Sequence, residues 1–530
     1  MSDKIDDNII GGFQQRRRLV QEFDELAQTS NEPQLVAMAR RLVHTYPPDL
    51  LATTVVKYLD TPSSQLRGGL GHVAALLPPD EILPLLRAVA ANRANSAQSR
   101  VTAALILERF LGEIVPQALL ADLNQTNEVA YQSLREAVEE GAHNRRVYLD
   151  YVTQMHAAGE PIAWMVLDLI ERLDPAQRVE LLRLMALDDR PAVARAALQR
   201  LERLAAEIPA AATAALASLS MMAAPEQAAL AERGLRKLQF SGVRHTPLPA
   251  FGWRSLLSPA DLGANFSVWF VKTPSEATRD DGLFLALVLQ PRRGIVEAFG
   301  NDQLEAAQLP APQQMGRPVR VHTDRGESAT LVEIPFDVGR QLLRVVQAAY
   351  VADSTLSILP GDYRLFGADL WTCEPPQVEG ETGELLAAIG VDAPPSPPPS
   401  TTDLKALSSD VTRLLAHPAM RGWVLHPQRF IQDLRVGGAA LARLPYPEVA
   451  QLLLRELEQR PEQRAITDTL ASGLRVQALY FRLAGEPEVA TCATRVAAAV
   501  PHLALSLNPL LVRLLESGLR AVRSSDSSLV

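Results

Sequence analysis

The feature that most constrains the fold is a β-type segment, residues 265–334, in a chain whose other long segments have helical periodicity. Apolar residues occupy strand positions from Phe266 to Val271, and Pro274 ends this strand because proline cannot donate a hydrogen bond to a β-ladder. The apolar run 283–289 has the length of a buried strand, and the turn-forming residues 290–294 follow it directly. The sequence therefore predicts a β-hairpin near the middle of the chain.

A second hairpin is predicted further along the same segment. Its strands are 319–321 and 329–334, with Gly326 as the left-handed residue of the turn. Two hairpins alone are marginal in water, so we expect a helix to cover them, with Asp337 as its N-cap. The apolar positions of that helix follow helical spacing at Leu342, Val346, Ala349 and Tyr350.

Residues 361–371 are expected to add a final strand or loop to this part of the chain. Together these elements predict a small α+β middle domain with antiparallel hairpins over residues 247–375.

The amino-terminal part of the chain carries an internal repeat. Successive leucines of the repeat are 35, 29, 33, 31 and 32 residues apart. Two small residues precede leucine at Gly68-Gly69-Leu70, Ala103-Ala104-Leu105, Ala196-Ala197-Leu198 and Ala228-Ala229-Leu230, and Leu134 and Leu167 continue the series. This period predicts one helical hairpin per repeat, in which small residues permit close helix crossings and stacking buries the apolar faces.

The pattern resembles the HEAT and armadillo class of α-solenoids over roughly residues 16–240. The resemblance is to the superfamily, and the segment 191–204 is most similar to the second helix of such a repeat. It implies a helical-repeat arm over residues 1–246 that offers an extended surface to a protein partner. An irregular helical bundle, in which Ala-Ala-Leu runs align by chance, is the alternative.

The sequence Gly68-Gly69-Leu70-Gly71 is also compatible with a phosphate-binding loop. No strand pattern precedes it, and no Gly-Lys-Ser or Gly-Lys-Thr follows it. We therefore interpret these glycines as positions of close helix packing.

Composition changes abruptly after the middle domain. Residues 376–402 contain no lysine or arginine and include a run of prolines at 394–399, which is typical of a stiff, acidic linker. A recognition role for the proline run is the alternative. Helical patterns then resume at 404–416, 428–443, 447–459, 462–484, 487–499 and 508–523, and they predict an all-helical domain over residues 403–530. The predicted fold class is mainly α: a HEAT-like helical-repeat solenoid arm, the α+β middle domain and a C-terminal all-helical domain.

Charge and cysteine content exclude several classes of function. The formal net charge is −9, and no segment is strongly basic: residues 247–375 hold 11 basic and 15 acidic side chains, and residues 403–530 hold 15 and 12. Nucleic acid is therefore not an expected ligand. Cys373 and Cys492 lie far apart, and we expect two unpaired thiols in a reducing compartment. With no signal-peptide pattern and no apolar run long enough to span a bilayer, we expect a cytoplasmic protein without a membrane partner.

No local motif of catalysis, metal binding or cofactor binding is present. His417 and His426 each precede proline and have no acidic or cysteine neighbour at ligand spacing, so we expect no metal site, no cofactor and no catalytic residues. Rigid hairpins present their tips well for contacts. The candidate ligand or partner contacts are therefore Arg292 and Arg293 on the first hairpin, with His322 and Asp324 on the second.

Two functions from different classes fit this organisation. The first is a non-enzymatic scaffold or adaptor, in which the repeat arm binds a protein partner and the middle domain supplies a second contact or a homo-oligomer interface. The second is a ligand-binding protein or enzyme, with a pocket where the middle domain meets a helical arm and with Arg292, Arg293 and His322 engaging an acidic small molecule. The second class rests on fold-level analogy, because some HEAT-like solenoids are enzymes.

Overall fold

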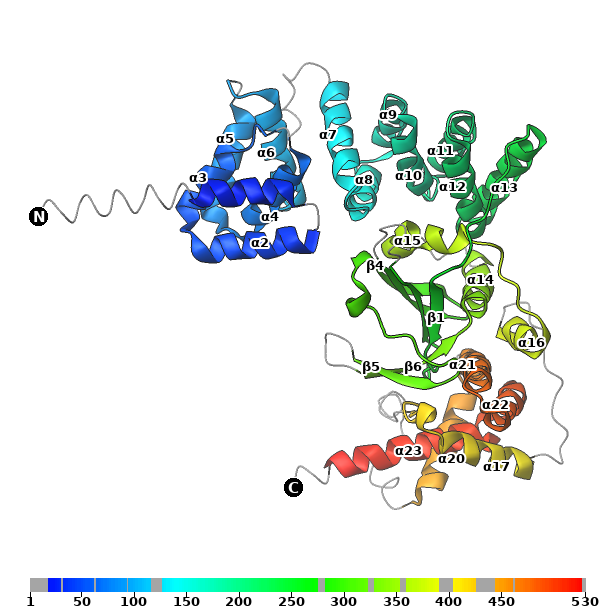
Figure 1. Cartoon of the computed structure of the whole chain (residues 1–530). Coiled ribbons are helices and arrows are strands. Elements are labelled where there is room, and N and C mark those ends of the chain that lie inside the picture. The colour runs from blue at the N-terminus through cyan, green and yellow to red at the C-terminus, as the bar shows by residue number, and fades with distance from the viewer. Residues whose placement is uncertain are drawn as a thin grey trace, which may run out of the picture. The chain divides into compact units, whose positions relative to one another are not determined.

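The computed structural model describes most of the chain (Figure 1). The described residues are 18–29, 32–61, 63–92, 94–115, 126–274, 282–322, 328–352, 359–389, 404–425, 444–460 and 463–526. The chain divides into two compact units, one formed by Met1–Leu219 with Ala229–His245 and the other by Ser220–Ala228 with Thr246–Val530. Each unit is described by itself.

The regular secondary structure in the described residues of the first unit is helical, and the end of its α12 and the start of its α13 belong to the second unit. A helix at residues 18–28 is followed by α2 (Glu32–Thr45), α3 (Pro48–Lys57), α4 (Ser64–Leu76), α5 (Pro79–Ala91), α6 (Ala97–Arg109), α7 (Thr126–Gly141), α8 (Arg146–Ala157), α9 (Glu160–Ile170), α10 (Pro175–Met185), α11 (Pro191–Leu204), α12 (Pro209–Met222) and α13 (Pro225–Phe240). Proline occupies a first-turn position in several of them, where its missing N–H breaks no helical hydrogen bond. The hydroxyls of Ser63 and Ser96 cap α4 and α6 by accepting from backbone N–H groups.

The repeat leucines lie on alternate helices except at α6 and α7, which follow one another among the described helices. Each of α4, α6, α7, α9, α11 and α13 carries one of them. Leu70, Leu134 and Leu167 are fully buried. The interpretation of the glycines is also confirmed: a Cβ on Gly69 would lie 2.5 Å from Leu26, and one on Gly71 would lie 2.4 Å from Phe110. This arrangement is compatible with an α-solenoid, while the HEAT or armadillo class stays a prediction.

The second unit contains a six-stranded antiparallel sheet with the strand order β4-β3-β2-β1-β6-β5. Its strands are β1 (Trp253–Leu257), β2 (Phe266–Lys272), β3 (Gly282–Gln290), β4 (Gly294–Leu304), β5 (Pro318–His322) and β6 (Ser328–Ile334). Both predicted hairpins are present, and Gly294 begins β4 with a φ of 77°. Gly326 lies outside the described residues.

The central strand β1 was not anticipated. It is only five residues long, and Arg254 and Ser255 interrupt its apolar pattern. Its neighbours are β2 and the much later β6, so its place in the sheet depends on pairing across a long stretch of sequence.

Two helices, α14 (Phe336–Ala352) and α15 (Gly361–Trp371), pack against the sheet. The first is the predicted covering helix, with Leu342 and Val346 buried. It begins at Phe336, so Asp337 lies in its first turn and is not the N-cap.

The expectation of a strand or loop at residues 361–371 is wrong, because this segment is α15. Pro360 occupies its N-cap position, and Phe366 packs so closely on β4 that a Cβ on Gly300 would lie 2.3 Å away. Burial against the sheet therefore decides its conformation.

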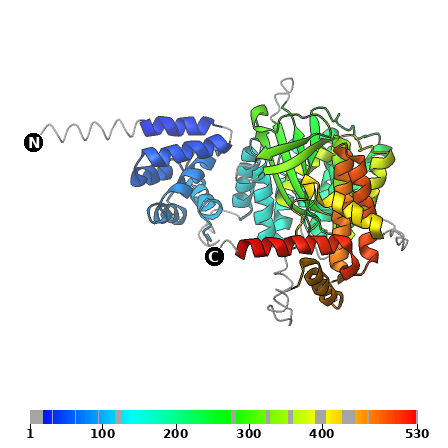
Figure 2. The same ribbon diagram turned by 90° about the horizontal axis from the view of Figure 1, so that it is seen from below.

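The described part of residues 403–530 is helical, as expected. It contains α17 (Leu404–Leu415), α20 (Tyr446–Glu458), α21 (Gln463–Leu483), α22 (Pro487–Ala499) and α23 (Pro509–Asp526). The helix α16 (Gly380–Ile389) lies instead within residues 376–402, which were expected to be a linker, and its Leu386 and Ile389 are buried. Figures 1 and 2 show α21 beside the strands of the second unit. The predicted helix at 428–443 and most of the proline-rich segment lie outside the described residues.

The loop between β1 and β2 joins the sheet to these helices. The Ala260 carbonyl accepts from Trp423 Nε1 at 2.7 Å, and its N–H donates to Gln477 Oε1 at 2.8 Å. The four-part division of the sequence stays a prediction, and these two bonds connect its second part to its fourth.

Candidate functional site

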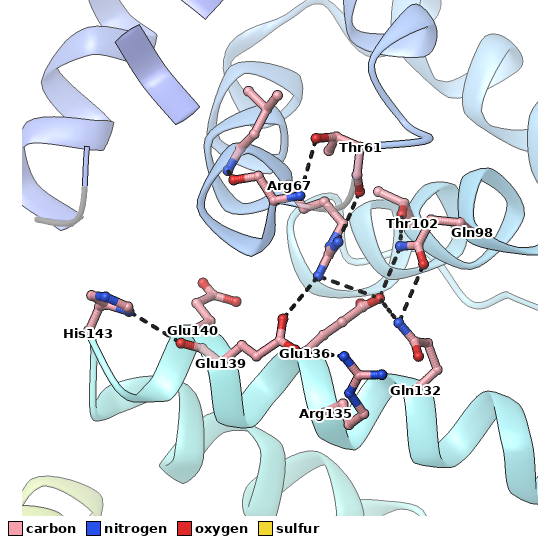
Figure 3. A network of polar contacts seen from close by, with 12 residues as sticks. Thr61, Arg67, Gln98, Thr102, Gln132, Arg135, Glu136, Glu139, Glu140 and His143 are labelled. Atoms are coloured by element: carbon pink, nitrogen blue, oxygen red, sulfur yellow. Dashed lines mark hydrogen bonds and ion pairs between the residues drawn. The ribbon is translucent and has the colours of Figure 1, made fainter. Parts of the chain in front are cut away.

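The apolar core of residues 18–115 ends where α4 and α6 meet α7. Its buried members run from Leu19 to Leu107, with half-buried residues as far as Val115, and none of its described members lies on α7. Polar side chains join α4 and α6 to α7, and we call them the polar joint: Arg67, Gln98, Thr102, Arg109, Gln132, Glu136, Glu139 and Glu140. Figure 3 labels all of them except Arg109.

Two charged side chains of the polar joint are buried. Arg67 on α4 and Glu136 on α7 expose 9% and 8% of their side chains. In Figure 3 Arg67 projects toward Glu136 and Glu139, while Gln98 and Gln132 converge on Glu136. Arg67 donates to the Thr61 carbonyl at 3.0 Å, and the two glutamines donate to Glu136 Oε1 at 3.1 and 3.2 Å.

The ion pairs of the polar joint are long. Arg67 Nη2 lies 3.7 Å from Glu136 and 4.0 Å from Glu139, and Arg109 Nη1 lies 3.6 Å from Glu140. A hydrogen-bonded guanidinium–carboxylate pair is separated by about 2.7–2.9 Å. A cavity of about 30 Å³ lies among these side chains, which is enough for one water molecule.

Two grooves of the first unit share part of their lining at equivalent repeat positions. One, of about 250 Å³, is lined by Tyr131, Arg135, Val138, Glu139, Arg172, Leu173, Asp174 and Gln177. The other, of about 270 Å³, is lined by Ile170, Glu171, Arg178, Leu182, Arg200, Arg203, Leu204 and Glu207. Arg172 and Leu173 stand five and six residues after the repeat leucine Leu167, and Arg203 and Leu204 stand at the same positions after Leu198. We call these two sites the repeat grooves.

Aromatic and charged contacts hold the walls of the repeat grooves in place. In the first groove the Arg172 guanidinium lies 3.7 Å from the centre of the Tyr131 ring. In the second, Arg200 binds Asp168 at 2.7 Å and Glu171 at 2.9 Å. The groove walls are therefore fixed surfaces made by neighbouring helices.

A tight charge cluster joins α10 to Arg145, the N-cap residue of α8, in the same unit. Burial opposes ionisation of Glu180, but ion pairs with Arg183 and Arg145 outweigh it and lower the pKa of this carboxyl to about 2. Arg183 binds both oxygens of Glu180, at 2.9 and 2.7 Å. Glu180 is thus ionised at neutral pH and acts as a structural partner of the two arginines.

A cluster of His156, Asp188 and Asp189 has ligand atoms within 4.8 Å of one another. Asp188 is not available for a metal, because Arg190 binds its two oxygens at 2.7 and 2.6 Å. His156 Nε2 lies 2.8 Å from Asp189. We therefore interpret this cluster as ion pairing at the turn between α10 and α11.

The structure separates the contact residues predicted from the sequence. Arg292 and Arg293 form the turn between β3 and β4, and His322 is the last residue of β5. The sheet order places these two hairpins at opposite edges, so the arginines and His322 are roughly 20 Å apart at about 4.8 Å per strand. Asp324 lies outside the described residues.

Both cysteines are buried and unpaired. Burial raises the pKa of the Cys373 and Cys492 thiols, and Asp410 raises that of Cys492 further. A reactive cysteine needs a lowered pKa, so neither thiol has the environment of a nucleophile.

The polar joint and the repeat grooves were not among the residues singled out from the sequence. Their partners come from different helices, and no local spacing reveals such pairs. One signal was visible: Glu140 stands six residues after Leu134, where four of the six repeats have an apolar residue. Such an interruption marks a place where neighbouring repeats meet through charge.

Comparison with known proteins adds no relative. No family model matches the chain, and neither the curated proteins nor the solved structures gave a match. Among the described residues, no helix is long and apolar enough to cross a membrane.

Proposed function

We propose that the protein is a non-enzymatic scaffold or adaptor that holds a protein partner along its helical-repeat unit. The observation that carries the proposal is that the repeat grooves of two successive repeats both take an arginine and a leucine at the fifth and sixth positions after the repeat leucine. A site that recurs with the repeat suits a ligand that is itself extended, because each groove can receive one part of it.

The dimensions of the repeat support an extended segment as the ligand. Packed helices lie about 8–10 Å apart, and an extended chain advances about 3.3 Å per residue. Side chains about three residues apart would therefore reach successive grooves. The proposal keeps the HEAT or armadillo-like class for this unit and a cytoplasmic location, which two unpaired, buried cysteines support.

The test is affinity purification from the native host. The unaltered protein is expected to recover a stoichiometric partner, and the double variant Arg172→Glu with Arg203→Glu is expected to lose it, because both grooves change charge. The matched control is Arg233→Glu on the exposed face of α13. Recovery of the protein alone, or only of self-associated copies, would contradict the proposal.

A further inference from the structure

Two arginines, Arg292 and Arg475, lie where the β3–β4 turn meets α21 in the second unit. Arg292 Nη2 binds Asp468 Oδ2 at 2.8 Å, which attaches the turn to the helix. Arg475 lies seven residues further along α21, two helical turns on and on the same face as Asp468. Arg293 is the exposed neighbour of Arg292 in the turn.

Arg475 is half-buried and makes no hydrogen bond or ion pair with any residue in the described ranges. Burial lowers the pKa of the Arg475 guanidinium, and the like charge of Arg292 lowers this pKa further, whereas Asp468 raises it. Asp468 is thus near both arginines but is hydrogen-bonded to Arg292. A half-buried charge without a bonded partner is unfavourable, and an anion would relieve it.

Among the described residues, Asp261 in the neighbouring loop does not supply that partner. The Gln290 amide donates to the Gly263 carbonyl at 3.1 Å, which brings the loop 261–265 close to the turn. In that loop Asp261 already accepts from the backbone N–H of Asn265 at 2.7 Å and from its side-chain amide at 2.9 Å.

We propose that Arg292, Arg293 and Arg475 form an oxyanion-binding site that receives a phosphate or carboxylate group in competition with Asp468. Guanidinium groups match the geometry of both anions through paired N–H donors. Residues 247–375 carry more acidic than basic side chains, which favours a single anionic group over a long polyanion. The site goes beyond the scaffold function and does not rest on it.

The same chemistry has two sources, a free metabolite or an acidic side chain of a protein. Thermal unfolding of the full-length protein with inorganic phosphate, citrate or a short glutamate-rich peptide distinguishes them, with sodium chloride at matched ionic strength as the baseline. Stabilisation by phosphate or citrate assigns a free anion, and stabilisation by the peptide alone assigns a protein source. Either result supports the site, and no stabilisation above sodium chloride by any probe would overturn it.

Two variants are expected to change the affinity of the protein for the stabilising probe, one lowering it and the other raising it. Arg475→Gln should weaken it on the order of tenfold, because a charged hydrogen bond is lost. Asp468→Asn should strengthen it by a few-fold, because the competing carboxylate is gone. The control Arg344→Gln, on the exposed surface of α14, should leave it unchanged.

The opposite changes in affinity expected for Arg475→Gln and Asp468→Asn distinguish an effect on anion binding from an effect on protein stability. A purely structural role for Asp468 would make Asp468→Asn less stable and give no gain in affinity, which would refute the proposal. Unchanged affinity in Arg475→Gln would also refute it. If Arg475→Gln does not fold, Arg293→Gln replaces it in the test, because Arg293 is exposed. Loss of the Arg293 guanidinium should still weaken anion binding by a few-fold.

Discussion

The polar joint of the first unit and a buried chain of polar side chains in the second unit both remove polar groups from water. They differ in how closely those groups are bonded to one another. In the second unit Tyr363 donates to Gln347 at 2.9 Å and accepts from Trp371 Nε1 at 3.0 Å, and Gln347 donates to the Met222 carbonyl at 3.0 Å. In the polar joint the ion pairs measure 3.6 to 4.0 Å. The polar chain of the second unit is buried and is bonded at hydrogen-bonding distance, whereas the polar joint is only partly buried and its ion pairs are longer.

This difference in bonding indicates which buried polar groups fix the packing around them. A fully bonded chain of neutral groups gains cooperative strength in a low dielectric and fixes the packing around it. Charges that are buried but not in hydrogen-bonding contact lose their hydration, and their mutual attraction does not fully offset that loss. We therefore expect the second unit to depend strongly on its polar chain and the polar joint to tolerate replacement by apolar groups.

The largest expected effect comes from breaking the tight chain. Tyr363→Phe leaves the buried Trp371 N–H and the Gln347 oxygen without a partner, and it should lower the free energy of unfolding by about 3 kcal/mol. Chemical denaturation followed by circular dichroism measures this loss. The control Tyr131→Phe removes one exposed hydroxyl bond and should cost less than about 1 kcal/mol. Equal losses in both variants would remove the contrast between the regions.

In the polar joint, Arg67→Ala should lower the free energy of unfolding by about 2 kcal/mol, because Glu136 stays buried without its cation. The double variant Arg67→Met with Glu136→Leu replaces both charges by apolar groups and should lose less than half as much. The same denaturation measurement compares the two. A double variant as unstable as the single one would show that the loose pairs contribute net stability.

The pH dependence of Glu180 tests a tight ion pair in the same unit as the polar joint. The pKa of Glu180 is about 2 in the folded protein, below its ordinary value, so its contribution to stability is complete at neutral pH and is lost as pH falls toward 2. Between pH 7 and pH 3 this loss should be about 2 kcal/mol. Glu180→Gln should flatten that part of the stability curve, and an unchanged curve would show that the pair does not lower the pKa.

The smallest expected effect is that of salt on the polar joint. Raising sodium chloride from about 0.05 to about 0.5 M screens its partly exposed pairs and should weaken them by about 0.5 kcal/mol, roughly twofold in an opening equilibrium. Hydrogen exchange of the α7 amides should accelerate by that factor, while the amides of α15 should not change. Faster exchange in both helices would show a global effect in place of a local one.

Local patterns were enough to predict much of the fold. The strands β2 and β3 and the helices α17 to α23 that fall in described residues follow apolar periodicity and turn residues that lie within the elements themselves. The positions of β1 and α15 were missed because each is decided by a partner far along the chain. Tertiary contact thus overrode local preference in both.

The candidate sites also depend on contacts between residues that are far apart in sequence, which local patterns do not reveal. The two arginines of the turn could be selected from the sequence, but Asp468 lies 176 positions from Arg292 and was not connected with it. In the polar joint, Arg67 and Glu136 likewise come from α4 and α7, which are not adjacent in sequence. In a single sequence, only an interruption such as Glu140 points to such pairs.

The bonds that hold the β1–β2 loop have a consequence for synthesis on the ribosome. Ala260 and Gln477 are 217 positions apart, so at about 5–20 residues per second the loop waits about 10–40 s for this partner. β1 also waits for β6 before both of its edges are paired. Until β6 has been made, β1 has an open edge with unpaired N–H and C=O groups. A chain truncated before α21 would keep the Ala260 N–H without its Gln477 acceptor.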